Sequence, residues 1–458
     1  MGFHSAVRDP RPFQPTYAGH TRCGGLHAFV FPVLLHPTAS QTLKHVIHYS
    51  RSTLTNGLRV LIHEDASTPM AAVNILYNVG ARDESPERTG FAHLFEHLMF
   101  GGSANAPDFD EPLQLAGGEN NAFTNNDLTN FYDIVPAENL ETALWLESDR
   151  MAALRFDEQV LDVQRKVVVE EFKETCLNEP YGDVWHHLAD MAYKVHPYRW
   201  PTIGKVPRHV EEATIEEVKD FYHKFYRPNN AILTVCGKVR AEEVLALVDK
   251  WFGDIPAGPV PPRRLPVEPP QRRLEQRINE APVPADALYL AFHTPARTEP
   301  GFYAADLLSD LLCNGASSRL YRRLLKEQQL FSYIDAYVTG SIDPGLLIVE
   351  GRPSHGVSLE EAEAAIWREL DQLNAEMVSE RELQKVKNKT ESSLLFSELN
   401  VLNKAINLAY FELLGDPELI NREAALYQAV SREDIRRIAR RVLSPDNCSE
   451  LYYKKAGA

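Results

Sequence analysis

The hydrophobic and polar positions of this 458-residue chain follow strand and helix periods from about residue 51 onward. Residues 52–62 alternate around Asn56-Gly57, a dipeptide typical of tight hairpin turns, so two short strands are expected there. Residues 71–79 alternate in the same way and predict a third strand. A different spacing begins at Phe91, where apolar residues recur at the three- and four-residue intervals of a helix.

The helix expected at residues 91–98 carries chemically active side chains opposite its apolar side. Its apolar stripe consists of Phe91, Leu94, Phe95 and Leu98. His93, Glu96 and His97 lie together on the other side, because residues three and four apart are neighbours on a helix. Two imidazoles one turn apart can bind one zinc ion, and the carboxylate between them then lies within reach of a water on that ion. This H-x-x-E-H order is the one found in inverted zinc peptidases.

The rest of the first half alternates between helix and strand patterns. Strands are expected at residues 121–124 and 128–135, after Gly117-Gly118, and at the apolar run 231–236. The helical patterns cover residues 138–153, 157–177, 183–193, 214–225 and 241–252. This mixture predicts an α+β domain.

A composition break separates this half from a second, similar one. Seven prolines lie between Pro256 and Pro270, which is typical of an extended interdomain linker. Beyond it the order of elements recurs, and residues 296–300 echo residues 81–85. The second half shows strand patterns at 287–292, 333–339 and 345–350, and helical patterns at 302–313, 318–328, 358–375, 379–412 and 432–441.

The expected fold is therefore α+β, with two homologous α/β-sandwich halves, each a mixed, largely antiparallel sheet flanked by helices. The expected boundaries are an irregular leader over residues 1–50, a zinc-binding half over 51–255, the proline-rich linker over 256–270 and a half without a metal site over 271–458. Only the first half contains H-x-x-E-H.

A catalytic zinc site with two histidines needs a third protein ligand and an open position for water. The best candidate helix covers residues 161–174, where Gln164, Glu171 and Glu174 share one face. Glu170 points about 100° away from that face. The spacing alone does not choose between Glu171 and Glu174.

Two competing interpretations remain open at the level of the residues. The helix at 91–98 would also fit an amphipathic surface helix with a polar face, and the acids at 161–174 would then be a solvated helix face. A different site could use His186 and His187 after Trp185, but adjacent residues diverge by 100° on a helix and make a poor chelate.

Composition excludes several classes of partner. A net charge of -16 argues against nucleic acid or an anionic membrane as the main partner. The cysteines are few and form no C-x-x-C pair, so neither a disulfide framework nor a thiolate zinc site is indicated. They are Cys23, Cys176, Cys236, Cys313 and Cys448. No apolar run approaches the 18 residues of a membrane-spanning helix.

The first fifty residues differ from the rest of the chain. They contain four basic residues and a single acid. Pro32 interrupts the apolar run at 28–35, so this run would make a poor signal-peptide core. We expect a disordered leader, with the protein cytoplasmic, or periplasmic if this leader is a cleaved signal.

The metal motif and its spacing resemble the insulinase/pitrilysin family of zinc peptidases. His93-x-x-Glu96-His97 is followed 74 positions later by the second glutamate of a Val-Val-x-Glu-Glu segment. The shorter, processing-peptidase-like branch is the closest match in length. This resemblance implies one zinc ion per chain, with Glu171 as the third ligand beside His93 and His97. The family usually has an acid where this chain has Gln164, so a group that tunes the ligand is replaced.

The resemblance covers residues 51–445 and extends to substrate-binding positions. Asn121-Ala122 is similar to the edge strand with which the family binds the substrate backbone. Residues 317–320 open a helix like that of the family's second domain, where an arginine and a tyrosine seven residues apart reach the scissile carbonyl. Tyr333 matches the tyrosine, and Lys326 stands at the arginine position, where lysine keeps the charge and loses the bidentate fork. A solvated Lys326 and a core Tyr333 are the alternative.

The implied function is a zinc metalloendopeptidase that hydrolyses short or unfolded peptides held as an added edge strand. Glu96 would act as the general base, and Tyr333 with Lys326 would stabilise the oxyanion. The family analogy also implies two halves facing each other across a chamber, and a homodimer or a heterodimer with a related subunit. The competing hypothesis from another class is a non-catalytic scaffold or partner subunit of the same fold.

Overall fold

The computed structural model describes residues 46–259 and 262–457. Residues 48–458 form one compact unit, which contains both halves. The leader expected at residues 1–50 lies outside the described residues up to residue 45. In the part of the chain that the structure describes, no helix combines the length and the apolar character that crossing a bilayer requires.

The first half is built on a six-stranded sheet with the order β1-β2-β6-β3-β5-β4. Its strands are β1 (Ser50–Thr53), β2 (Arg59–Glu64), β3 (Met70–Tyr77), β4 (Glu119–Thr124), β5 (Thr129–Pro136) and β6 (Ala231–Gly237). All neighbouring pairs are antiparallel except β2 and β6. The expected hairpin forms at Asn56-Gly57, where Gly57 has a φ of 86° that favours glycine.

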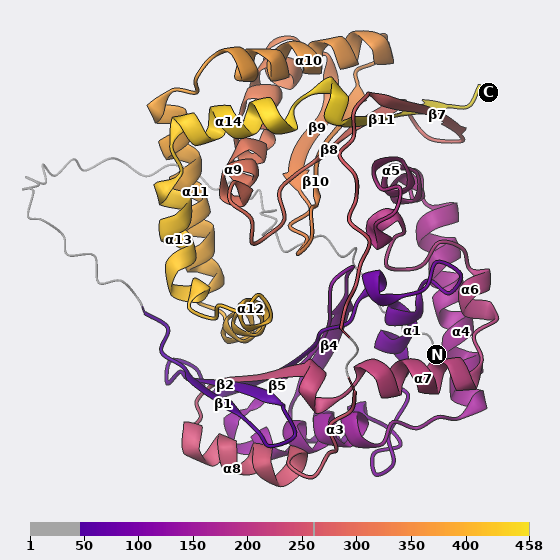
Figure 1. Ribbon diagram of the computed structural model, residues 1–458, viewed down its shortest axis with the longest axis vertical. Helices are drawn as coiled ribbons and strands as arrows, with labels where there is room; N and C mark the ends of the chain where they lie inside the picture. The colour runs from indigo at the N-terminus through magenta and orange to yellow at the C-terminus, as the bar shows by residue number, and fades with distance from the viewer. Residues whose placement is uncertain (1–45, 260–261, 458) are drawn as a thin grey trace, which may run out of the picture. The chain divides into compact units, whose positions relative to one another are not determined.

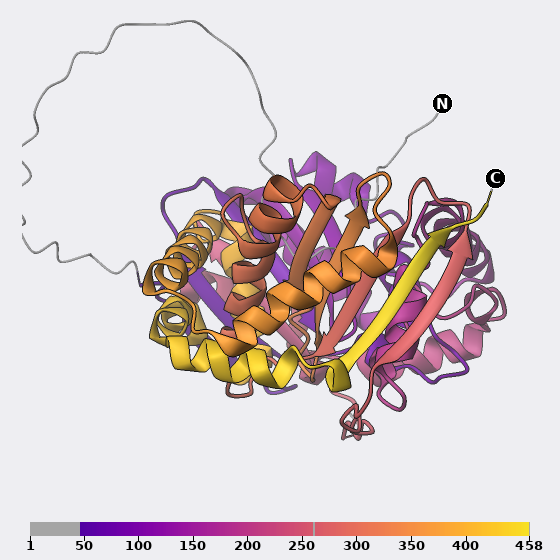
Figure 2. The same cartoon turned by 90° about the horizontal axis from the view of Figure 1, so that it is seen from above.

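The second half repeats this sheet with one strand fewer, in the order β7-β11-β8-β10-β9. Its strands are β7 (Glu275–Ala281), β8 (Ala287–His293), β9 (Phe331–Val338), β10 (Leu346–Pro353) and β11 (Cys448–Lys455). Again one pair, β7 and β11, is parallel and the others are antiparallel. In Figure 2 the yellow strand β11 runs beside β7. The matching order confirms two related, largely antiparallel halves.

Helices cover both faces of each sheet. In the first half they are α1 (Phe91–Leu98), α2 (Asp110–Leu115), α3 (Leu140–Ala152), α4 (Glu158–Phe172), α5 (Val184–Ala192), α6 (Arg208–Glu211), α7 (Ile215–Phe225) and α8 (Ala241–Phe252). In the second half they are α9 (Phe302–Cys313), α10 (Leu359–Ala375), α11 (Glu380–Ser397), α12 (Val401–Leu413), α13 (Leu419–Ala429) and α14 (Arg432–Val442). Alternate strand residues point to the two faces, so each sheet has two apolar layers to bury.

The two halves exchange one helix each. Helix α12 of the second half packs on β3 and β6 of the first sheet, and α5 of the first half packs on β8 and β11 of the second (Figure 1). The Thr234 hydroxyl on β6 donates to Ala405 O at 2.8 Å, and the buried Lys404 pairs with Asp65. Each half therefore completes the other's core, which explains why residues 48–458 form a single unit.

Several expected elements differ in detail. The single helix expected at 379–412 is wrong, because residues 398–400 separate α11 from α12, and the Asn400 side chain begins the new helix by accepting from Leu402 N. The expected helix at 318–328 contains a π-helical segment, η6 (Tyr321–Glu327). Strands β7 and β11 and helix α13 were not expected, since their polar and apolar positions follow neither period clearly.

The described part of the linker has no regular secondary structure between Phe252 and Glu275, as its prolines predict. The linker is nevertheless hydrogen-bonded to the first half. The Glu268 carboxylate accepts from the amides of Lys194, Val195 and His196 at 2.8–2.9 Å. The linker is thus held at defined points along its path.

Candidate metal centre

Helix α1 presents the H-x-x-E-H residues and is fixed at its N-terminus. Gly90 precedes it with a φ of 87°, a left-handed conformation that suits glycine, and a Cβ there would lie 2.8 Å from Ile203 O. The buried Glu84 carboxylate accepts from Gly90 N at 2.9 Å and from Ala92 N at 2.8 Å. Trp200 Nε1 also donates to this carboxylate at 3.1 Å. These bonds satisfy helix amides that have no partner within the helix.

The apolar stripe of α1 is buried as its spacing predicts. Phe95 stacks on Phe221 and Tyr226, with ring centroids 5.1 and 5.0 Å apart. Leu94 and Phe95 are fully buried, and Phe91 and Leu98 nearly so. Burying this stripe leaves the polar side of α1 turned toward α4, which contacts it.

His93, His97 and Glu171 meet between these two helices. Glu171 Oε2 lies 3.2 Å from His93 Nε2 and 3.3 Å from His97 Nε2. The two imidazole rings are 4.8 Å apart at their centroids. Among the described residues this is the only group of three or more His, Cys, Asp or Glu side chains placed to hold a metal ion.

The donor set fits a zinc ion. In a tetrahedral site with bonds of about 2.0–2.1 Å, neighbouring ligand atoms lie about 3.3–3.4 Å apart. The two Glu171 distances, 3.2 and 3.3 Å, match that separation. Two imidazole nitrogens and one carboxylate oxygen are also the ligand types of catalytic zinc sites.

The electrostatics of the centre favour a cation. Burial lowers the pKa of His93, but its interactions with Glu171 and Glu96 outweigh this and raise it to about 10. Burial likewise raises the pKa of Glu171, yet its contacts with His93 and His97 hold it well below its usual range. A proton on His93 therefore balances the acids where a metal cation would.

Glu96 lies beside the ligand cluster without being part of it. Its Oε2 atom is 3.6 Å from His93 Nδ1, the ring nitrogen that points away from Glu171. Burial raises the pKa of Glu96, but the contact with the neighbouring His93 outweighs this effect, so the net direction is downward. Glu96 is consequently ionised and can accept a proton.

The alternatives left open by the sequence have other contacts. Glu174 lies in a π-helical segment, η3 (Lys173–Asn178), and is not among the clustered ligands. His186 Nε2 contacts Gly204 O at 3.0 Å, and His187 Nε2 contacts Asp183 Oδ2 at 3.1 Å. The two histidines have separate partners and form no joint site.

Strand β4, which carries Asn121 and Ala122, is the last strand of its sheet and pairs only with β5. The Asn121 side chain accepts from Ala122 N at 2.8 Å. An amide that bonds a side-chain oxygen instead of β5 is one that faces the open edge. Asn121 Oδ1 thus occupies a position where the carbonyl of an added strand would bind.

Tyr333 lies on β9, the edge strand of the second sheet. Its hydroxyl donates to Glu350 Oε1 at 2.6 Å. The cation beside its ring is Arg352, with the guanidinium carbon 5.2 Å from the ring centroid, and the same group lies 4.8 Å from the Tyr181 ring. Lys326 is exposed and lies over Tyr321, at 5.4 Å.

The groups that hold the start of α1 were not expected from the sequence. Besides Glu84 and Trp200, His209 Nδ1 accepts from Thr89 N at 3.2 Å and contacts the Thr89 hydroxyl at 2.9 Å. The recurrence of Ala-Arg-x-Glu at residues 81–84 and 296–299 was the available signal. It marks the segment before α1 and α9 without showing that Glu84 caps the helix.

Comparison with protein families identifies matches to both halves. Residues 59–205 match the family described as Insulinase (Peptidase family M16), and residues 212–390 match the one described as Peptidase M16 inactive domain. The chain is 31% identical over 345 residues to "Zinc protease PqqE" of Helicobacter pylori, covering 73% of this chain and 77% of that protein.

Two further relatives cover most of the chain. "Probable mitochondrial-processing peptidase subunit beta, mitochondrial" of Arabidopsis thaliana is 27% identical, over 75% of this chain and 66% of that protein. Among solved structures, a protease from Helicobacter pylori matches with a TM-score of 0.84 and 26% identity, covering 89% of this chain and all of that one.

Proposed function

Because this chain belongs to the insulinase family of peptidases, family M16, we propose that it is a zinc-dependent endopeptidase. The observation that carries the proposal is the convergence of His93, His97 and Glu171, with Glu96 beside them. Relatives of this chain are named zinc proteases, which supports zinc as the metal. The three ligands would leave one position of a tetrahedral ion open.

In the proposed reaction, each residue of the site has a separate role. When bound, zinc supplies Lewis-acid polarisation of a peptide carbonyl and acidifies water. His93, His97 and Glu171 hold the ion, and the Glu96 carboxylate accepts the proton of the attacking water and delivers it to the leaving amine. Tyr333, with Lys326 or the neighbouring Arg352, is proposed to donate to the carbonyl oxygen as negative charge develops there.

The proposed substrate is a short or unfolded peptide in an extended conformation. The free edge of β4 supports this, because backbone pairing gives affinity with little dependence on side chains. The substrate carbonyl would replace Asn121 Oδ1 on the Ala122 amide. Folded proteins would be poor substrates, since their strands are already paired.

A homodimer, or a heterodimer with a related subunit, is the proposed assembly. A relative of this chain is named as a subunit of the mitochondrial processing peptidase, which supports an assembly of related chains. Light scattering on the purified protein, with and without a related chain, measures this directly.

The second candidate is a non-catalytic partner subunit, because the family that matches residues 212–390 is described as inactive. That match starts at residue 212, after the H-x-x-E-H segment and Glu171, and runs into the second half, whereas residues 59–205 contain all four residues of the site. The intact site therefore favours the peptidase.

Replacing Glu96 by glutamine tests the proposal. The Glu96→Gln variant should bind one equivalent of zinc and lose at least about 100-fold in peptide hydrolysis, the range of one acid–base group. His97→Ala should lose the zinc as well. Undiminished hydrolysis by Glu96→Gln, or absence of hydrolysis in a zinc-loaded wild type, would contradict the peptidase assignment.

A further inference from the structure

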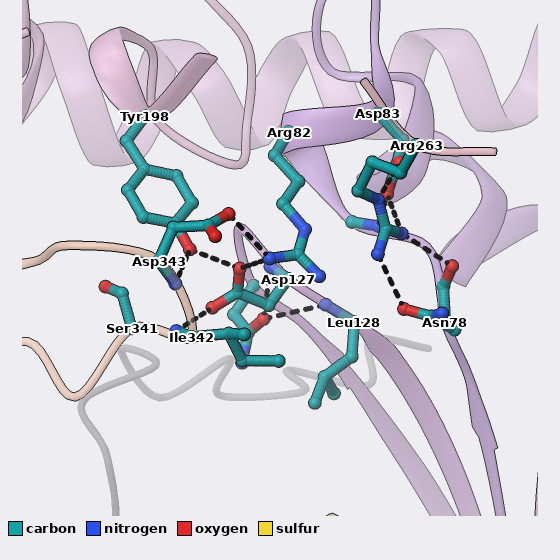
Figure 3. A network of polar contacts seen from close by, with 12 residues as sticks. Asn78, Arg82, Asp83, Asp127, Leu128, Tyr198, Arg263, Ser341, Ile342 and Asp343 are labelled. Carbon is teal, nitrogen blue, oxygen red and sulfur yellow. Dashed lines mark hydrogen bonds and ion pairs between the residues drawn. The ribbon is translucent and has the colours of Figure 1, made fainter. Parts of the chain in front are cut away.

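The short turn η1 (Ala81–Asp83) lies where distant segments of the chain meet, as Figure 3 shows. Two of its amides bind the loop between β4 and β5. Ala81 N donates to Asn125 O at 3.1 Å, and Arg82 N donates to Asn126 O at 2.9 Å. The turn is thereby fastened to the end of the proposed peptide-binding strand β4.

The Arg82 side chain extends this contact to the second half. Its Nη1 atom lies 2.7 Å from Asp127 Oδ1 and 2.9 Å from Asp343 Oδ2. Asp127 belongs to the β4–β5 loop, and Asp343 belongs to the loop between β9 and β10. Arg82 is 4% exposed, so the guanidinium in this contact is shielded from water, while Asp343 is 34% exposed.

Neighbouring groups strengthen the same contact. Asp127 Oδ2 accepts from Ile342 N at 2.9 Å, and Tyr198 donates its hydroxyl proton to Asp127 Oδ1. Asp343 N donates to the Tyr198 hydroxyl at 3.1 Å. Every bond joins the first half to residues 342–343 or orients a group that does (Figure 3).

The linker is attached to the next residue of the turn. Arg263 donates from Nε and Nη2 to the two oxygens of Asp83, at 2.8 and 2.9 Å, and from Nη1 and Nη2 to Asn78 at 3.0 Å. This bidentate pair has defined geometry. Consecutive side chains of η1 therefore hold the second half and the linker.

The same segment leads directly into the metal helix. Glu84 follows η1 and accepts from Gly90 N and Ala92 N at the start of α1. A continuous series of contacts thus runs from the β9–β10 loop to α1, through Asp343, Arg82, the η1 backbone and Glu84. The β4–β5 loop joins this series through Asp127.

We propose that Arg82 is a positioning residue that couples docking of the second half, through Asp343, to the placement of the edge strand β4 relative to α1. When Asp343 pairs with Arg82, the β4–β5 loop is bound both to η1 and to the second half. Without the Asp343 carboxylate, Asp127 keeps Arg82 and the Ile342 amide, but the contact between the halves loses the ion pair that joins Arg82 to the β9–β10 loop. The kinetic consequence rests on the proposed peptidase function, whereas the structural consequence does not.

The variant Asp343→Asn tests this coupling with little risk to folding, because Asp343 is 34% exposed and Arg82 retains Asp127. On an unstructured fluorogenic peptide we expect KM to rise roughly 10-fold with kcat within about 3-fold, since the strand that binds the peptide is displaced while Glu96 and the ligands are unchanged. Zinc content should stay at one equivalent. Asp343→Glu should recover most of the lost affinity.

Hydrogen exchange distinguishes the proposed coupling from a purely local ion pair, because a local ion pair would not change amide exchange at residues 119–128. In Asp343→Asn, amides of residues 119–128 should exchange faster together with those of residues 339–346, while the core strands β3 and β6 stay protected. Asp416→Asn is the matched control, because Asp416 is an ion-paired and similarly exposed acid in the loop between α12 and α13. It should change neither KM nor exchange at residues 119–128.

Two results would overturn the proposal. One is faster exchange confined to residues 339–346, which would show that docking is not transmitted to β4. The other is an unchanged KM in a variant whose exchange at residues 119–128 has risen. If the wild type fails to cleave any peptide, the exchange comparison still decides the coupling, so the two proposals fail separately.

Discussion

At the scale of single residues, the metal centre depends on which carboxylate faces the imidazoles. Glu171 and Glu174 are three residues apart and share a helical face, so both satisfied the sequence pattern. The structure ends the regular α4 at Phe172 and continues it as a π-helical segment that contains Glu174. Glu171 is thus the residue within ligand distance of both histidines. A local change of helix type is not readable from periodicity.

A carboxylate outside the metal site predicts how stability depends on pH. Burial, with a contribution from Asp306, raises the pKa of Asp310 on α9 from 3.8 to about 6. Asp310 bonds Asn314 and Thr390, whose hydroxyl also donates to Val386 O. Between pH 4 and 6 the folded state therefore binds a proton that the unfolded state has released.

Because of this difference, the contribution of Asp310 to the free energy of unfolding falls as the pH rises from about 4 to about 6. Above about pH 6 this contribution stays constant. Asp310→Asn should match the wild type near pH 4 and exceed it by about 1–3 kcal/mol above pH 6. Urea unfolding at pH 4.5 and pH 7.5 measures both differences. An equal difference at the two pH values would show that Asp310 titrates normally.

At the scale of elements, the sequence predicted those with a strong period. α1, α8 and α9 begin and end within about two residues of the expected positions, since long apolar stripes and glycine boundaries define them. β11 was missed because its first six residues are all buried, so polar and apolar positions do not alternate along it. The contacts around η1 were missed as well, because they join segments far apart in the sequence, by 180 positions for Arg263–Asp83 and 261 for Arg82–Asp343.

The edge strand gives a prediction about substrate binding. Ala122→Pro removes the amide that Asn121 now caps, and proline is tolerated where an edge N–H faces outward. The variant should keep its zinc and its melting temperature within a few degrees, and KM for an extended peptide should rise at least about 10-fold, which corresponds to one hydrogen bond. Steady-state kinetics and calorimetry measure these quantities.

A peptide N-methylated at one backbone position at a time serves as the matched experiment, because it removes a donor from the substrate side. If neither the proline variant nor any methylated peptide changed KM, backbone pairing on β4 would not be the binding mode.

At the scale of the whole molecule, the exchanged helices make the two halves one folding unit. Helix α12 packs on β3 and β6, its Leu408 and Ala409 are fully buried, and its Lys404 pairs with Asp65, with 6% and 11% exposure. A separate domain of residues 51–255 would leave the face of β3 and β6 uncovered. The sequence predicted two halves from their repeated order, but the exchange requires contacts that no local pattern encodes.

Breaking that pair tests the exchange. Lys404→Met leaves the Asp65 carboxylate, 11% exposed, without its cation and with only the hydrogen bonds from Ser67, so the free energy of unfolding should fall by about 1–3 kcal/mol, and both halves should unfold in one transition. The double variant Lys404→Met, Asp65→Leu should recover most of this loss. Denaturant unfolding followed by fluorescence and circular dichroism measures it. Two separate transitions in the wild type would contradict a single folding unit.

The proposed metal centre requires two imidazoles on α1 and one carboxylate on α4 to bind a single ion. Diffraction from crystals grown with zinc, measured on both sides of the zinc absorption edge, locates that ion. We expect one strong anomalous peak per chain, about 2.0–2.2 Å from His93 Nε2, His97 Nε2 and a Glu171 oxygen. A peak elsewhere, or one bound by the histidines while Glu171 points away, would contradict the proposed centre.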